Sequence, residues 1–165
     1  VSNLSSYEAE FDKLIATPGL PPFIPTDPTI EEPATFALEK HLEDFLVANW
    51  KNTILGKQYN IFEDEGEKVG QQYQTDSGAI DILAVSKDKR TLLVVELKRG
   101  RASDVVVGQT LRYMGYVKEV LAENGQNVRG VIIAMEDDPR MKRALAIVPT
   151  IDFFRYEVTF KLRKD

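Results

Sequence analysis

The chain has 165 residues, 43% of them hydrophobic, which suits one globular domain with its own core. It has no cysteine and one histidine, His41, which excludes disulfides, thiolate metal sites and sites that need two imidazoles from one chain. Its formal net charge of -5 argues at first against a nucleic-acid partner, because Lys and Arg drive phosphate binding.

Neither a run of 18 apolar residues nor a secretory signal pattern occurs in the sequence. We therefore expect a soluble protein with no membrane partner, and the cytoplasm is the favoured location. The first residue is Val1 rather than Met, which suggests a fragment or a processed product. A further domain upstream is compatible with this start.

The first part of the chain is rich in proline, with six prolines in residues 17–33. Because proline interrupts helices and central strands, we expect residues 1–34 to form an extended lead-in. A single domain is expected over residues 35–165. Thr35 is a suitable N-cap for its first helix, in which Leu38, Leu42 and Leu46 recur at helical spacing.

The remaining elements follow from alternating patterns of apolar and polar residues. A strand is expected over residues 57–62, followed by an acidic turn. Residues 78–86 and 91–99 are two β-branched, apolar runs joined by the polar KDKR, which predicts a hairpin. Both runs are apolar at odd and even positions, as in central strands covered on two faces.

After the hairpin we expect a helix over 104–123 capped by Ser103, a strand over 127–135, a short helix over 139–147 and a closing strand over 151–162. The predicted order is α-β-β-β-α-β-α-β. This order indicates an α/β domain with a mixed central β-sheet flanked by helices.

Three charged residues interrupt the predicted hairpin. Glu96 and Lys98 are two apart, so they project from the same face of one strand, and Asp81 lies between Ile80 and Ile82 on the other. Two carboxylates and one ammonium group would then lie within reach of one another, which suits Mg²⁺ and an attacking water. The alternative is a buried ion pair between Asp81 and Lys98, with Glu96 extending into solvent.

Two motifs resemble a known family. Gly78-Ala79-Ile80-Asp81 followed by Glu96-Leu97-Lys98 resembles the core of the PD-(D/E)XK nucleases, with Ile80 in place of the usual Pro. The segment from Gly108 to Tyr113, GQTLRY, is similar to the helix of the NucS-like branch of these nucleases. Gln109 and Tyr113 are four residues apart and therefore share a helix face, whereas Leu111, Met114 and Leu121 are expected in the core.

The resemblance implies a restriction-endonuclease-like fold and a Mg²⁺- or Mn²⁺-dependent endonuclease that hydrolyses phosphodiester bonds in DNA, in repair or defence. It implies that Asp81, Glu96 and the Leu97 carbonyl bind the metal and that Lys98 assists the water. Gln109 and Tyr113 would position the site and the substrate. Members of this family often carry a separate DNA-binding and dimerising domain, so a homodimer is compatible, but residues 1–35 are too short to form that domain.

The family also places a catalytic glutamate on the first helix, for which Glu39 and Glu43 are the candidates. At 100° per residue the apolar stripe centres near Leu42, which leaves Glu39 at its border and Glu43 about 110° away. We therefore predict Glu39 as the catalytic residue, acting through a water molecule, and Glu43 as solvent-facing. Both residues could also be ordinary solvated glutamates.

The basic residues are concentrated between Lys87 and Lys118, a segment that contains eight basic and three acidic residues. This local excess predicts a DNA-backbone contact by Arg99, Arg101 and Arg112, although a solvated face is the alternative.

Two other functions stay open: a catalytically inactive nuclease-fold module that binds nucleic acid or supports assembly, and an enzyme acting on RNA.

Overall fold

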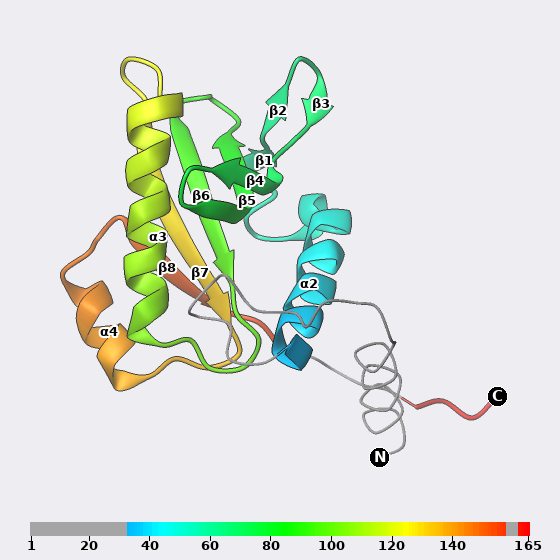
Figure 1. Ribbon diagram of the computed structural model, residues 1–165. Helices are drawn as coiled ribbons and strands as arrows, with labels where there is room; N and C mark the ends of the chain where they lie inside the picture. Colours follow the sequence, from blue (N-terminus) through cyan, green and yellow to red (C-terminus); the bar gives the residue numbers. More distant parts are fainter. Residues whose placement is uncertain (1–32, 158–161) are drawn as a thin grey trace, which may run out of the picture.

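The structure is a computed structural model, and it describes residues 33–157 and 162–165. A mixed six-stranded sheet lies at its centre (Figure 1). The strands follow the order β1 (Tyr59–Ile61), β5 (Gly78–Ser86), β6 (Thr91–Leu97), β7 (Asn127–Ala134) and β8 (Ile151–Arg155), and β4 (Gln71–Thr75) also pairs with β5. β5 and β6 are antiparallel, whereas β6, β7 and β8 are parallel.

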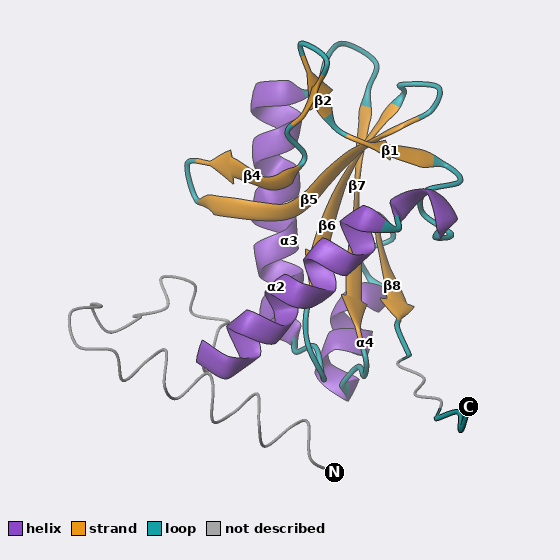
Figure 2. Ribbon diagram, turned by 90° about the vertical axis from the view of Figure 1, so that its right-hand side faces the viewer, coloured by secondary structure: helices purple, strands orange, loops and turns teal. Residues whose placement is uncertain are grey.

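Helices cover both faces of this sheet. α2 (Pro33–Ala48) lies on one face, and α3 (Asp104–Tyr116) and α4 (Pro139–Ala146) lie on the other (Figure 2). α3 connects β6 to β7 and α4 connects β7 to β8, as expected when parallel strands need a crossover. The result is a three-layer α/β/α arrangement.

The core consists of two apolar clusters separated by the sheet. On the side of α3 and α4, Leu83 and Val94 pack with Met114 and Met141. On the side of α2, Ala84 and Val95 pack with Trp50 and with partly buried helix residues. Neighbouring residues of β5 and β6 enter opposite clusters, so both faces of these strands are covered. This confirms the prediction that their continuous apolar runs form central strands.

The predicted order α-β-β-β-α-β-α-β is confirmed in α2, β1, β5, β6, α3, β7, α4 and β8. The sequence interpretation missed β4, and the expected acidic turn is a small hairpin of β2 (Glu63–Asp64) and β3 (Glu67–Lys68). These segments are polar and carry no apolar alternation. The predicted lead-in over 1–34 lies outside the described residues except for its last two positions, which already belong to α2.

Several predicted boundaries differ from the structure. α2 begins at Pro33 rather than after Thr35, in agreement with the preference of proline for the first helical turn. α3 gives way to a π-helical turn over Val117–Leu121, and Ser103 precedes α3 without a capping side-chain hydrogen bond. β8 ends at Arg155, and residues 158–161 of the expected closing strand lie outside the described part. No described helix has the length and apolarity needed to cross a membrane.

Candidate active site

The antiparallel pairing of β5 with β6 places Asp81 beside Glu96. The backbone N–H of Leu97 donates to Oδ2 of Asp81 at 2.8 Å, and the N–H of Asp81 lies 3.4 Å from Oε1 of Glu96. Each acid therefore contacts the backbone of the strand that carries the other. Glu96 is only 1% exposed, so the alternative in which this side chain extends into solvent is wrong.

Lys98 follows β6 directly and keeps its extended geometry, because its N–H donates to the carbonyl of Ile133 on β7 at 2.8 Å. The spacing of two from Glu96 therefore has the meaning expected for a strand. The Lys98 side chain is also buried, at 8% exposed. Its positive charge acts on Asp81, where it lowers the pKa of the carboxyl group.

Burial nevertheless dominates the ionisation of Asp81 and raises its pKa from 3.8 to about 7. The hydrogen bond from Leu97 and the charge of Lys98 act in the opposite direction, whereas the charges of Glu43 and Glu39 raise the pKa further. The protein thus concentrates negative charge at this end of the sheet. A perturbed carboxyl group of this kind is typical of a functional site.

The prediction that Glu43 faces solvent is wrong, because this residue is only 3% exposed. Gln71 Nε2 donates to its Oε1 at 2.9 Å, and Gln72 Nε2 donates to its Oε2 at 2.6 Å. Lys40 adds an ion pair at 3.3 Å. The apolar stripe of α2 could not reveal this environment, since the two glutamines come from β4, which the sequence interpretation missed.

Glu39 lies one turn earlier on α2 and is partly buried, as expected for the border of the stripe. Its Oε1 accepts a hydrogen bond of 3.0 Å from the backbone N–H of Arg99. Glu39 therefore contacts the chain just after Lys98, and both glutamates of α2 border the cluster. The structure links Glu43 to Asp81 more directly, because the Gln72 amide contacts both carboxylates.

Gln109 and Tyr113 lie on the inner face of α3, at 4% and 3% exposed, and Gln109 Nε2 is 3.4 Å from the Tyr113 hydroxyl. The hydroxyl also lies close to Gly78, where an added Cβ would be 2.8 Å from it. The predicted shared face is confirmed. Met114 is buried as expected, but Leu111 is 41% exposed, so its assignment to the core is wrong.

Only part of the basic segment lies at the carboxylate end of the sheet. Arg99 and Arg101 follow Lys98 and are exposed, and Arg101 pairs with Glu136 at 3.3 Å. Arg112 is exposed on α3. Other members, such as Lys89, lie in the β5–β6 turn, a full strand of about 20 Å from the site. The local excess of positive charge is therefore divided between the two ends of the sheet. The sequence could not reveal this division, because the residues at both ends are close together in the chain.

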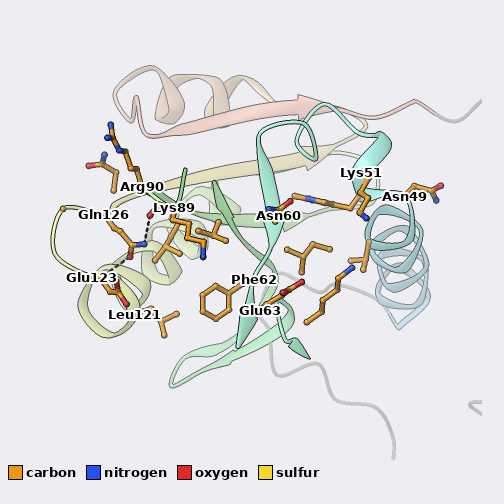
Figure 3. A pocket seen from close by; sticks show the side chains of 18 of the residues that line it. Asn49, Lys51, Asn60, Phe62, Glu63, Lys89, Arg90, Leu121, Glu123 and Gln126 are labelled. Carbon is orange, nitrogen blue, oxygen red and sulfur yellow. Dashed lines mark hydrogen bonds between the residues drawn. The ribbon is translucent and has the colours of Figure 1, made fainter. Parts of the chain in front are cut away.

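A cavity of about 1630 Å³ lies at that opposite end of the sheet (Figure 3). Its lining includes the basic residues Lys51, Lys68, Lys89 and Arg90 together with several asparagines. Gln126 joins two parts of the wall, because its side chain contacts Lys89 and Glu123. None of the predicted catalytic residues lines this cavity, so it is separate from the carboxylate cluster.

The carboxylate cluster fits a hard divalent cation in part. Within residues 33–157 and 162–165, no three Asp, Glu, His or Cys side chains converge closely enough to hold a metal by themselves. Mg²⁺ does not need such a cage, because it binds through one or two carboxylates and keeps waters or substrate phosphate as further ligands. Asp81 and Glu96 supply two carboxylates, and the burial that raises the pKa of Asp81 favours a compensating cation.

Comparison with known proteins also indicates a nuclease domain. Residues 39–155 match the family model described as Endonuclease NucS C-terminal domain. The chain is 34% identical to endonuclease NucS of Sulfolobus acidocaldarius over 95 residues, which cover 56% of this chain and 36% of the relative. It is 26% identical to endonuclease NucS of Methanopyrus kandleri, over 74% of this chain and 43% of the relative.

Solved structures share the fold. A repair endonuclease from Pyrococcus abyssi matches with a TM-score of 0.54 at 24% identity, over 80% of this chain and 50% of that chain. The structure of an EndoMS–dsDNA complex matches with a TM-score of 0.57 at 20% identity, over 84% and 52%. These likenesses confirm the restriction-endonuclease-like fold, although the chain spans only about half of each structure. Together with the matched family model, they show that the chain belongs to the family of the endonuclease NucS C-terminal domain.

Proposed function

We propose that this chain is a nuclease domain that hydrolyses phosphodiester bonds in DNA, with Mg²⁺ or Mn²⁺ as its cofactor and DNA repair as its setting. The observation that carries the proposal is the convergence of Asp81, Glu96 and Lys98 at one end of β5 and β6. The family supports it, because the relatives are endonucleases and a neighbouring structure contains double-stranded DNA.

The proposed cofactor would be held by the carboxylates of Asp81 and Glu96 and by the carbonyl of Leu97. When bound, the metal would supply a Lewis acid that polarises the scissile phosphate and lowers the pKa of water. The protein prepares this site by fixing the carboxylates. Oδ2 of Asp81 is held by Leu97 at 2.8 Å, and Oδ1 by Gln72 at 3.2 Å.

Lys98 contributes a buried ammonium group next to the same carboxylates. We propose that it orients the attacking water and stabilises the negative charge that develops on the phosphate in the transition state. A charge that is fixed in a water-poor site needs no reorganisation during the reaction, which is why such groups are effective. The same charge would interact less strongly with the phosphate on the surface, where water and ions screen it.

The first-helix glutamate and the α3 pair complete the proposal. Glu43 is assigned the role of the first-helix carboxylate, since its side chain shares the Gln72 amide with Asp81. Glu39 keeps the predicted role of an acid acting through water at the edge of the site. Gln109 and Tyr113 on α3 are proposed to hold the start of β5 in place, through the close approach of the Tyr113 hydroxyl to Gly78.

The competing function is a module that kept the fold and lost catalysis. The presence of both strand carboxylates and the buried lysine on paired strands disfavours it. A panel of labelled single-stranded, flapped, mismatched and duplex DNAs, each with and without Mg²⁺ or Mn²⁺, tests the proposal. Metal-dependent cleavage of any of these DNAs supports it, and cleavage only of a matched RNA panel would show that the substrate is RNA.

A further inference from the structure

Gln72 occupies an unusual position in β4. The pairs Gln71↔Ile82 and Tyr73↔Ile80 flank it, so Gln72 stands opposite Asp81 in the ladder between β4 and β5. Its φ is +51°, in the left-handed region that side chains other than glycine rarely adopt. The other described non-glycine residues with positive φ, Glu65 and Lys89, lie in hairpin turns, where this conformation closes the turn.

The Gln72 side chain connects two carboxylates of the site. Its Nε2 donates to Oε2 of Glu43 at 2.6 Å and lies 3.2 Å from Oδ1 of Asp81. An amide nitrogen carries two N–H groups, so each carboxylate receives one of them. An acidic side chain at this place could not do the same, because it would repel both carboxylates.

The backbone conformation explains how this contact becomes possible. In a regular strand, successive side chains point to opposite faces. Here the consecutive side chains of Gln71 and Gln72 both reach Glu43 on α2. β5 is irregular at the opposing position as well, because Ile80 packs in the cluster on the α3 side and Ile82 in the cluster on the α2 side. Both strands thus lose their alternation at Gln72 and Asp81.

Glycine would adopt this φ without strain, yet the position carries a long polar side chain. Backbone strain of this kind persists where the surrounding structure imposes it, and it concentrates at functional sites. The strain at Gln72 coincides with contacts to two acids of the cluster. The side chain, rather than the backbone, is therefore the reason for a non-glycine residue here.

We propose that Gln72 is a positioning residue for catalysis, which fixes the carboxylates of Glu43 and Asp81 relative to each other across α2 and β5. The inference rests on the proposed nuclease function, because it concerns the same site. Removal of a group that orients metal-binding carboxylates commonly lowers metal affinity or activity by about 10- to 100-fold. We expect Gln72→Gly to lower kcat by this factor, with the KM for DNA unchanged.

Gln72→Gly is an informative variant because glycine keeps the backbone geometry and removes only the amide. Gln72→Asn is the second variant: asparagine tolerates positive φ and keeps an amide, but its side chain is one methylene shorter and cannot span both acids. We expect the same loss of kcat. Glu65→Gly is the matched control, since it relieves a similar φ of +50° in the β2–β3 turn, and kcat should stay at the wild-type value.

The experiment measures kcat, KM and melting temperature for these proteins on the DNA that the wild type cleaves, together with Mn²⁺ affinity by calorimetry. A lower kcat per folded molecule and weaker Mn²⁺ binding in both Gln72 variants support the inference. Wild-type kcat per folded molecule, or a change confined to KM, overturns it. If Gln72→Gly does not fold, Gln72→Asn decides by the same criteria. Absence of cleavage by the wild type would instead contradict the proposed function itself.

Discussion

The backbone N–H of Leu97 on β6 holds the carboxylate of Asp81 on β5 through a 2.8 Å hydrogen bond. This bond favours the ionised acid, but it is outweighed by burial and by the nearby negative charges of Glu43 and Glu39. The Asp81 carboxylate is thus well oriented and at the same time costly to ionise. A site with these two properties is preorganised for a cation, and the cost is a lower stability of the metal-free protein.

The pH dependence of the metal-free protein follows from this balance. The pKa of Asp81 is about 7 in the folded protein and near 3.8 when unfolded, so between these values the folded state holds a proton that the unfolded state has lost. Stability should therefore fall as the pH rises from about 4 through about 7. Thermal unfolding in a chelating buffer at pH 5 and pH 8 measures this effect.

Asp81→Asn removes the titrating group, so the melting temperature of this variant should depend less on pH than that of the wild type. Asp76→Asn, in an exposed turn, removes one negative charge without touching the cluster and is the control. If the wild type and Asp81→Asn show the same change in melting temperature between the two pH values, the cost of ionising Asp81 is not significant.

Lys98 provides a test of the proposed chemistry. Lys98→Ala should lower the cleavage rate by at least about 10²-fold, because a fixed charge acts mainly on the transition state. DNA binding and the fold should be largely retained. Lys87→Ala in the exposed β5–β6 turn is the matched control. The ion-pair alternative predicts a loss of stability of roughly 3–5 kcal/mol instead, with unchanged activity per folded molecule.

The two helix glutamates give different expectations. Glu43→Gln should lower the cleavage rate and the Mn²⁺ affinity by about 10- to 100-fold, since it replaces a buried acceptor that two glutamine amides share. Glu39→Gln should have a smaller effect, because its contact is to the Arg99 backbone. Calorimetric titration with Mn²⁺ and single-turnover cleavage distinguish them. A larger loss in Glu39→Gln would reverse the assignment in favour of the sequence prediction.

The elements that could be predicted from the sequence are those in which burial is encoded locally. β5 has the predicted bounds, and β6 the predicted start, because their residues are apolar on both faces and polar residues mark the turn between them. Asp81, Glu96 and Lys98 were recognisable for the same reason: a charge inside a buried strand needs a partner. Antiparallel pairing then brought them together without further information.

The features that could not be predicted depend on contacts between distant segments. β4 reads QQYQT and has neither apolar alternation nor β-branched enrichment, so it is defined only by its pairing with β5. The burial of Glu43 depends on this strand, because Gln71 and Gln72 supply its partners. The sequence prediction placed solvent next to Glu43 on α2, but polar side chains occupy that place.

The approach of Tyr113 to Gly78 predicts a coupling between α3 and the start of β5. Gly78 has a φ of +124°, and a Cβ there would lie 2.8 Å from the Tyr113 hydroxyl. Gly78→Ala should therefore destabilise the protein through backbone strain and this clash. Tyr113→Phe removes the hydroxyl and leaves the ring carbon at 3.8 Å, so the double variant should be more stable than additivity predicts. Residues in contact typically couple by about 0.5–3 kcal/mol.

Denaturant unfolding of the wild type, both single variants and the double variant forms the required cycle. Gly66→Ala is a useful comparison because Gly66 has a φ of +84°, but no atom of the described residues lies within 4 Å of the added Cβ. It should show the cost of backbone strain alone. Additive free energies in the Gly78–Tyr113 cycle would mean that the hydroxyl moves away freely and that the contact imposes no constraint.

The separation of basic residues along β6 leads to a prediction about DNA binding. If Arg99, Arg101 and Arg112 contact the phosphate backbone, their replacement by alanine should weaken binding of all sequences alike. Each lost contact should reduce the slope of log K against log salt by about 0.7 to 0.9, depending on strandedness. Binding is measured without divalent metal, so that cleavage does not interfere.

Lys89 and Arg90 supply the comparison, because they belong to the same sequence segment but line the cavity at the other end of the sheet. If DNA is held only around the carboxylates, Lys89→Ala/Arg90→Ala should leave the slope unchanged while the triple arginine variant reduces it. The opposite result would place the backbone contact at the cavity. Arg101 also pairs with the exposed Glu136, so Glu136→Gln should strengthen binding slightly if Arg101 contacts phosphate, and have no effect if the arginine only serves that ion pair.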